Sequence, residues 1–369
     1  MRVRRSPHLV AYWRDGALVA TNYATRDSSL IDPFICQILD RCTAWTSVSR
    51  ISVELAVPSG AQLYSLIERL VGLNLLERED RAREGRARAM SHLDPWNPEA
   101  GFFHTSTKDV SFATSRQAAR YARRQAKRSP MPSVVKQYRG SKIVQLPKPK
   151  GDGQFPAVLR ARRTWRRFSK RPITGADLAT LLGLTSGVQQ WVASTPRDLA
   201  LKTSPSGGAR HSIETYVVIR EVAGLPSGIY HYAPDRHALE KVRGPVSVKR
   251  MRDYLPNSGY FAAASAMVFF TTMFERLLWR YHYSRAYRAA LIEAGHVCQT
   301  FCLTATWLGL APYCVMALAD SLIERDLGID GITESVLYAA GVGRPPAGSD
   351  WAPLPRGTLK VRRNSRLSR

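Results

Sequence analysis

The sequence predicts a protein of mixed helices and strands, in two folded regions joined by a basic segment. The chain of 369 residues exceeds one average domain, and a hydrophobic fraction of 44% is enough for buried cores. Apolar spacings typical of strands and helices recur in residues 1–80 and again from about residue 155, and the residues between them show no clear period. We therefore expect a small domain at 1–80, a basic linker or arm at 81–154 and a larger domain at 155–369.

The first region begins with a predicted hairpin over residues 8–23, because two apolar stretches flank Asp15-Gly16, a dipeptide suited to a type I′ turn. Asp32 is placed to cap a helix that begins at Pro33. We expect that helix to turn four apolar side chains inward: Phe34, Ile35, Ile38 and Leu39.

Two more helices are predicted in this region, at Ser49–Ala56 and at Ala61–Gly72. The second of them carries apolar residues on one face: Leu63, Leu66, Ile67, Leu70 and Val71. Leu75-Leu76 then has the character of a closing strand. Two strands, three helices and a final strand in so short a stretch predict a winged helix.

The middle of the chain is strongly basic. From Ser115 to Arg171 there are 18 basic residues and a single acid, Asp152. Four prolines interrupt the stretch, as in a linker or exposed arm: Pro130, Pro132, Pro147 and Pro149. The whole chain carries a net charge of +25, which attracts nucleic acid, an anionic membrane or an acidic peptide; an arginine-rich overall composition is the plainer alternative.

Membrane insertion and secretion are not expected. The N-terminus lacks the apolar core of a signal peptide. The longest apolar run, Tyr260–Phe274, is too short to span a bilayer. A cytoplasmic protein without a membrane partner is therefore predicted.

The five cysteines predict neither disulfides nor a metal site. Their odd number and irregular spacing do not fit a disulfide framework. Cys298 and Cys302 stand one helical turn apart, but no histidine or carboxylate completes a zinc set. We expect these two residues to act as small buried apolar side chains.

The second region alternates helices and strands. The predicted elements are a helix at 176–186, strands at Thr215–Arg220, Gly228–Tyr232 and 264–272, a long helix, and a last strand at Ser335–Val342. The long helix is predicted to end at Gly309. Its expected inner stripe is Tyr287, Leu291, Ala294, Cys298, Phe301, Ala305 and Leu308.

Three segments of this region are suited to chemistry. Arg162–Phe168 gathers guanidinium groups that can hold a phosphate, although basic clusters are often only solvated surface. Ser204–His211 combines serine hydroxyls with glycines that let the backbone approach a flat ligand; a plain turn is the alternative. Trp279–Leu310 contains the runs Arg285–Arg288 and Glu293–His296, and by its periodicity it is a buried helix in which His296 is a core residue.

In this order and spacing, the three segments resemble the nitroreductase superfamily, and most closely its SagB-type branch of azoline dehydrogenases. The resemblance covers residues 155–345. It includes the end of this region, at Leu327-Gly328, Glu334, Leu337-Tyr338 and Gly341–Gly343. It implies an α+β fold and an obligate homodimer with one FMN at each of two active sites between the subunits. The first eighty residues resemble the PqqD-like winged-helix elements that bind the leaders of precursor peptides.

The resemblance also implies roles for individual residues. The positions that match phosphate- and ribityl-binding residues are Arg162, Arg163, Thr164 and Arg166. The positions that match the loop along the flavin ring are Ser204, Pro205, Ser206 and Gly207. Backbone around Ala317, in the loop after Pro312, matches the approach to the reactive flavin nitrogen, and Arg356 in the tail matches a late basic residue on the phosphate.

One departure from the branch concerns the catalytic base. Branch members place a Lys-Tyr pair before the Arg-Ala-Tyr-Arg run, whereas this sequence has Arg280-Tyr281. Arginine cannot act as a general base, so Tyr281 becomes the candidate, with Arg280 and Arg285 as cations that favour its phenolate. His282 competes, because the pKa of an ordinary histidine suits proton abstraction. Packing at a dimer interface is the non-catalytic alternative.

The resemblance implies oxidation of a thiazoline or oxazoline to an azole in a ribosomal peptide, with the leader held by residues 1–80 and a cyclodehydratase as a further partner. The alternatives are an NAD(P)H-dependent nitro- or quinone reductase, and dehydrogenation of another bond in a peptide product. Nucleic-acid binding through the winged helix is not expected, because Ser49–Ala56 offers few long polar side chains to base edges.

Overall fold

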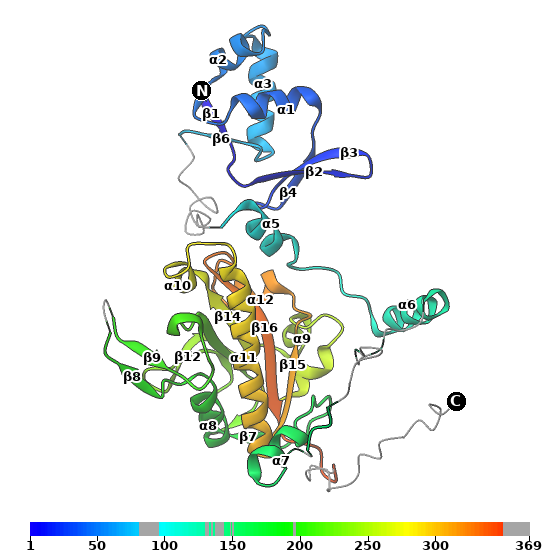
Figure 1. Cartoon of the computed structure of the whole chain (residues 1–369), viewed down its shortest axis with the longest axis vertical. Coiled ribbons are helices and arrows are strands. Elements are labelled where there is room, and N and C mark those ends of the chain that lie inside the picture. Colours follow the sequence, from blue (N-terminus) through cyan, green and yellow to red (C-terminus); the bar gives the residue numbers. More distant parts are fainter. Residues whose placement is uncertain are drawn as a thin grey trace.

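The computed structural model describes residues 1–80, 96–129, 133, 136, 144–147, 149, 151–194 and 197–349. The first 78 residues form a small unit of helices and short strands, and the residues from α7 onward form a larger unit built on a central sheet (Figure 1). The described residues therefore form two folded regions, and the mixture of helices and sheets in the larger one confirms the predicted α+β class.

The N-terminal region contains two small antiparallel sheets. Its strands are β1 (Arg2–Arg5), β2 (Leu9–Arg14), β3 (Ala17–Asn22), β4 (Asp27–Leu30), β5 (Thr46–Ser47) and β6 (Leu76–Arg78). Its helices are α1 (Pro33–Arg41), α2 (Val48–Glu54) and α3 (Ala61–Gly72). One sheet has the order β5-β1-β6 and the other β2-β3-β4, and a core of the three helices with β1 and β6 holds the region together.

The local predictions for this region are largely confirmed. The hairpin β2–β3 turns at Asp15 and Gly16, whose φ angles of 50° and 80° fit a type I′ turn. The Asp32 side chain accepts a hydrogen bond from the backbone N–H of Ile35 at 2.7 Å and so caps α1. The prediction for Phe34 is wrong: its side chain is 37% exposed, because the first turn of α1 extends beyond the core that Ile38 and Leu39 enter.

The segment predicted as a linker contains two helices. The first, α5 (Pro98–Ser106), packs with Trp96 against the larger region, in a cluster that also takes in Tyr23 and Ala24 from the N-terminal region and Phe274 from the larger one. The second, α6 (Ser115–Arg128), is exposed over residues 116–128 and projects from the body of the molecule (Figure 1). It begins with a capping box between Thr114 and Gln117, a signal that the basic composition masked.

The larger region surrounds an antiparallel sheet of six strands in the order β13-β12-β10-β14-β16-β15. These strands are β10 (Ile213–Ile219), β12 (Gly228–Ala233), β13 (Ala238–Arg243), β14 (Ala266–Met273), β15 (Ala311–Val315) and β16 (Glu334–Gly343). The short strands β7 (Ile173–Thr174) and β11 (Val222–Ala223) pair with each other, as do β8 (Gln190–Val192) and β9 (Leu199–Leu201).

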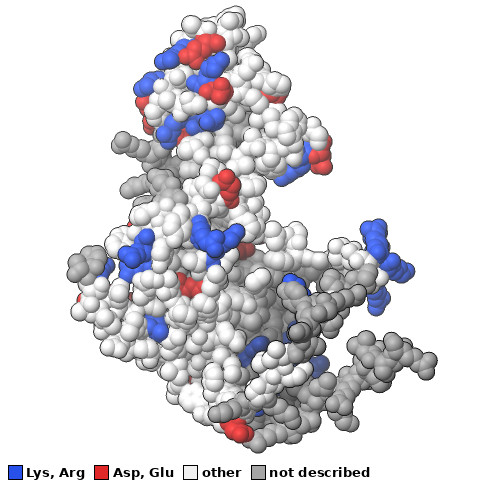
Figure 2. Space-filling view, viewed as in Figure 1, with Lys and Arg blue, Asp and Glu red and all other residues white. Residues whose placement is uncertain are grey.

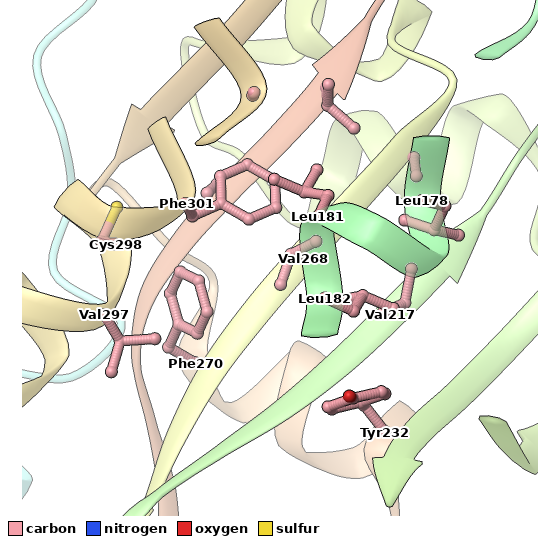
Figure 3. Packing of buried hydrophobic residues seen from close by; sticks show 14 of the residues in the cluster. Leu178, Leu181, Leu182, Val217, Tyr232, Val268, Phe270, Val297, Cys298 and Phe301 are labelled. Carbon is pink, nitrogen blue, oxygen red and sulfur yellow. The ribbon is translucent and has the colours of Figure 1, made fainter. Parts of the chain in front are cut away.

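Helices cover both faces of the six-stranded sheet. The elements are α7 (Gln154–Ala161), α8 (Gly175–Ser186), η1 (Gly207–Ala209), α9 (Val248–Asp253), η2 (Gly259–Ala263), α10 (Phe274–Leu278), α11 (Ala286–Trp307) and α12 (Asp320–Leu327). On one face α8 and α11 pack against Val217, Val268 and Phe270 (Figure 3). On the other face α9, η2 and α12 cover Val218 and Phe269. Because side chains alternate along a strand, consecutive residues of β10 and β14 enter opposite cores.

The predicted elements of this region are present, with one wrong residue and several short or edge strands that were not predicted. The helix at 176–186 is α8, the predicted strands are β10, β12, β14 and β16, and α11 ends before Gly309, whose φ is 73°. Leu291 was expected on the inner stripe of α11 but is 44% exposed. Ala317 lies in a loop, as expected, although Pro312 before it belongs to β15; β7, β8, β9, β11, β13 and β15 were not predicted.

Lys and Arg side chains gather on the projecting α6, whereas the N-terminal region shows acids and bases side by side (Figure 2). None of the helices in the described part of the chain is both long enough and apolar enough to cross a membrane.

Candidate active site

The loop from Ser204 to His211 has an unusual backbone. Gly208 has a φ of 58°, and the two non-glycine residues Ala209 and His211 also have positive φ angles, of 51° and 44°. Such angles are costly for residues with a Cβ and persist where surrounding contacts enforce them. The loop lies between β9 and β10 and contains the short helix η1.

Helix α11 fixes one side of this loop. The Ser204 and Thr300 hydroxyls lie 2.7 Å apart, and His296 Nδ1 lies 3.2 Å from the carbonyl oxygen of Pro205. One turn earlier, Glu293 accepts a hydrogen bond from Ser212 at 3.0 Å. The loop also closes on itself, because the His211 N–H donates to the Ser206 hydroxyl at 2.8 Å. The motif residues Glu293 and His296 therefore support the loop, and His296 is an exposed residue rather than a core one.

The segment after α10 covers the other side of the loop. The Tyr281 ring lies against the two glycines: a Cβ added to Gly208 would sit 3.0 Å from the Tyr281 hydroxyl, and one on Gly207 would sit 3.4 Å from the ring. The Arg210 guanidinium stacks over the Trp279 ring at 5.2 Å and donates to the Gly208 carbonyl at 2.9 Å. Glycine is required at 208 both by its φ angle and by the tyrosine.

The predicted catalytic residues differ in how they meet the loop. Tyr281 is half-buried against it, and the Arg280 Cγ lies 3.7 Å from the position of a Gly208 Cβ. His282 is exposed, and no contact of its ring with the loop is found among the described residues. The structure therefore brings Arg280 and Tyr281, but not His282, to the glycine loop.

Behind the loop lies a small polar cavity that the sequence did not reveal. It is lined by Thr185, Ser186, Lys202, Ser204, His211, Ile213, Glu293 and Val297. Burial, followed by the charge of Lys202, lowers the pKa of His211 to about 4. Burial lowers the pKa of Lys202 more than Glu214 raises it, and burial raises the pKa of Glu293. Lys202 lies only two residues before the loop, but nothing about its position in the sequence marked it as a residue of the site.

The predicted phosphate-binding arginines lie at the end of α7. Arg162, Arg163 and Arg166 are exposed, and no ion pair joins any of them to a carboxylate in the described part of the chain. Arg163 Nε donates to the carbonyl of Ala161 at 3.1 Å, and the Trp165 N–H donates to the Pro312 carbonyl at 2.9 Å, which anchors the segment to β15. Guanidinium groups without acid partners are suited to an anion.

The remaining predicted residues lie elsewhere. Thr164 is half-buried within the arginine segment, and Ala317 follows β15 on the way to α12. Arg356 lies outside the described residues. A larger open hollow of about 440 Å³, lined in part by Leu184, Tyr232 and His237, contains none of the predicted site residues.

Within one chain, no contact among the described residues joins the arginine segment to the glycine loop. The loop contacts Thr300 of α11, whereas the arginine segment is anchored to β15 through Trp165 and Pro312.

The two segments differ in chemistry. The arginines have no acid partner among the described residues and are of the kind that binds a phosphate, and the glycine loop combines hydroxyl and N–H donors with an exposed backbone.

The model of the nitroreductase family matches residues 159–344, which is half of the chain. The chain belongs to the nitroreductase family and is an oxidoreductase; the family generally uses FMN.

Three known proteins are similar in sequence to this chain. The nitroreductase-family protein MJ1384 of Methanocaldococcus jannaschii is 31% identical over 51% of this chain and 89% of its own length. The trifolitoxin-processing protein TfxB of Rhizobium leguminosarum bv. trifolii is 36% identical over 39% of either chain. The microcin B17-processing protein McbC of Escherichia coli is 29% identical over 38% of this chain and 53% of its own. This chain thus aligns with about two fifths of TfxB and half of McbC.

Among solved structures, a chain of the E. coli microcin synthetase McbBCD complex with truncated pro-MccB17 bound is similar over 70% of this chain and 97% of its own, with 19% identity and a TM-score of 0.49. The similarities to TfxB and McbC agree with the predicted SagB-type branch.

Proposed function

We propose that this chain is an FMN-dependent dehydrogenase that oxidises azoline rings, thiazoline or oxazoline, in a ribosomal peptide. The observation that carries the proposal is the glycine loop packed under Tyr281 in a nitroreductase-family chain whose relatives TfxB and McbC process peptides. Oxidation of an azoline removes a proton from Cα and a hydride from Cβ, and forms the second double bond of the ring. Bound FMN would accept the hydride, and molecular oxygen would be the final oxidant.

Arg162, Arg163 and Arg166 would hold the FMN phosphate, with Arg356 as a further contact. No carboxylate of the described residues pairs with them, which supports this assignment, because an incoming phosphate displaces no ion pair there. Ser204, Pro205, Ser206 and Gly207 would line the ring, with Thr164 near the ribityl chain and the backbone at Ala317 near the reactive nitrogen. The supports from Glu293 and Thr300 hold the loop in place before the cofactor arrives.

A homodimer would complete the site. No described contact joins the arginine segment to the glycine loop within one chain, and the loop of a second chain would bring both halves to one FMN. Exposed apolar residues support such an interface along α11 and its neighbours: Phe155, Leu159, Leu184, Leu291, Ile292 and Trp307. Exposed apolar side chains that gather into one patch usually mark an interaction site.

Tyr281 would take the Cα proton. Its hydroxyl lies at the glycine loop, and Arg280 lies beside the same glycine. His282 is the weaker candidate, because no contact brings it to the loop. The tyrosine assignment predicts that Arg280→Lys keeps activity, since only the charge is needed.

The N-terminal region would bind the leader of the precursor peptide as a PqqD-like winged helix, and a cyclodehydratase would supply the azolines. The cluster of Tyr23, Ala24, Trp96 and Phe274 supports this arrangement, because it seats the N-terminal region directly on the oxidoreductase. An edge strand of that region could accept the peptide as an added strand.

The test uses the purified full chain. We expect one FMN per subunit after heat extraction, a dimer by light scattering, and a loss of two hydrogens when a peptide containing a thiazoline is incubated in air. The double variant Arg162→Ala with Arg166→Ala should lose FMN. The matched control Arg123→Ala with Arg124→Ala, in exposed α6, should keep it. A chain that extracts without flavin would refute the proposal.

The second candidate function is reduction of nitro compounds or quinones with NAD(P)H, which family membership alone supports. The same preparation separates the two. Consumption of NAD(P)H with a small quinone, together with an unchanged thiazoline peptide, would favour the reductase.

A further inference from the structure

Three cysteines that are distant in the sequence meet in the core of the larger region. Cys298 and Cys302 stand one turn apart on α11, and Cys314 lies on β15, against which α11 packs. Cys298 lies among Phe301, Phe270 and Val297 (Figure 3). The three Sγ atoms all lie within 4.8 Å of one another, and this is the only such group of potential metal ligands in the part of the chain that the structure describes.

The spacing of the sulfur atoms suits a metal ion. With metal–sulfur bonds of about 2.3 Å, three sulfurs around one ion in a plane are about 4.0 Å apart. Sulfurs within 4.8 Å of one another therefore reach that geometry with shifts of less than about 1 Å, which side-chain rotation can supply.

The three sulfurs can be reached from outside. Cys314 is only half-buried, which leaves a path from the surface. Met316, two residues further, is 72% exposed and carries a second type of soft sulfur donor.

The number of ligands selects the ion. Structural zinc takes four protein ligands, and no histidine, carboxylate or fourth cysteine joins the three sulfurs among the described residues. Soft thiolates also select Cu(I), which accepts three of them without a fourth ligand. We propose that Cys298, Cys302 and Cys314 form a three-thiolate site for Cu(I) that ties α11 to β15.

The experiment titrates the reduced full chain with Cu(I) under anaerobic conditions, using the bicinchoninate complex of Cu(I) as the probe. We expect one Cu(I) per chain, three sulfur ligands at about 2.3 Å by X-ray absorption, and a rise in the melting temperature, because the ion binds the folded chain. Cys314→Ser and Cys298→Ser should each weaken binding at least tenfold. Cys36→Ser, a half-buried thiol of the N-terminal region, is the matched control and should bind as the parent does.

A second measurement needs no substitution. Alkylation of the native chain with and without Cu(I), mapped by mass spectrometry, should show protection of the half-buried Cys314 and none of Cys36. Binding that survives Cys314→Ser, or Cu(I) that leaves Cys314 as reactive as before, would overturn the proposal. Tighter binding of Zn(II) than of Cu(I), measured with a pyridylazo-resorcinol indicator, would overturn the choice of ion. Neither readout depends on FMN or on activity.

Discussion

A buried ion pair connects the segment after α5 to the larger region, and its removal should cost a measurable share of the stability. Lys108 Nζ lies 2.6 Å from both carboxylate oxygens of Glu324, and the two side chains are only 7% and 6% exposed. Lys108 also donates to the carbonyl of Gly331 and to the Ser335 hydroxyl. We consider the substitution Lys108→Met, which keeps the length of the side chain and removes its charge.

The expected loss follows from the groups left behind. Breaking a buried pair from one side typically costs about 3–5 kcal/mol, because the remaining charge is uncompensated. Glu324 keeps the Ser335 hydroxyl at 2.7 Å and the Val336 N–H at 3.3 Å, which places the loss at the lower end, about 3 kcal/mol. Burial lowers the pKa of Lys108 more than Glu324 raises it, so the pair itself contributes little beyond mutual neutralisation.

The assay is urea unfolding followed by far-ultraviolet circular dichroism. Lys108→Met should lower the free energy of unfolding by about 3 kcal/mol, and the double variant with Glu324→Leu should recover all but about 1 kcal/mol of it. The control Lys249→Met breaks the exposed pair with Asp253, where the lysine side chain is 87% exposed, and should cost less than about 0.5 kcal/mol. A Lys108→Met variant as stable as the control, or a double variant no better than the single, would show that the reasoning is wrong.

Four further predictions follow from single residues. Tyr281→Phe should keep FMN and lose at least tenfold in azoline oxidation while His282→Ala stays active; normal turnover by Tyr281→Phe would move the base elsewhere. Gly208→Ala should cost about 1 kcal/mol in thermal unfolding, because a Cβ at a φ of 58° would also press on the Tyr281 hydroxyl. Burial raises the pKa of Asp320 to about 6, so the protonated side chain stabilises the fold below about pH 4, and this contribution is lost as the pH rises through 6. Asp320→Asn should therefore remove this pH-dependent decline in the free energy of unfolding. Burial raises the pKa of Asp326, but hydrogen bonds from Arg250 and Tyr254 outweigh it and hold this pKa at about 2. The ionised carboxylate therefore stabilises the fold above about pH 4, and this contribution is lost as the pH falls through 2. Asp326→Asn should lower the free energy of unfolding by about 2 kcal/mol at pH 7 and by almost nothing at pH 2.

The sequence predicted a local structure correctly where only a few residue types can adopt or supply it. The Asp15-Gly16 turn and the Asp32 cap were predictable because few residues tolerate those backbone angles or supply that acceptor. The Ser204–His211 run was recognisable for the same reason, since its glycine is required by a positive φ.

Tertiary contacts explain what the sequence did not reveal. Lys202 lines the cavity behind the loop only because β9 brings it to Glu293 of α11. The third thiol of the cysteine group comes from β15, which lies after the end of α11 in the chain, and a search for ligand spacing along one helix cannot find it. The strand β13 is largely exposed, so its apolar pattern was weak.

Helix α11 shows why a single apolar stripe was the wrong expectation. The helix uses several sides: Glu293 and Thr300 hold the glycine loop, Cys298 and Phe301 enter the core, and Leu291 is exposed. Leu291, Ile292 and Trp307 leave apolar surface of α11 exposed, and exposed apolar surface often marks an interaction site. The proposed homodimer would cover this surface and would bring the loop of one chain to the arginine segment of the other. If α11 forms this interface, the charged substitution Ile292→Glu should yield monomers that have lost FMN.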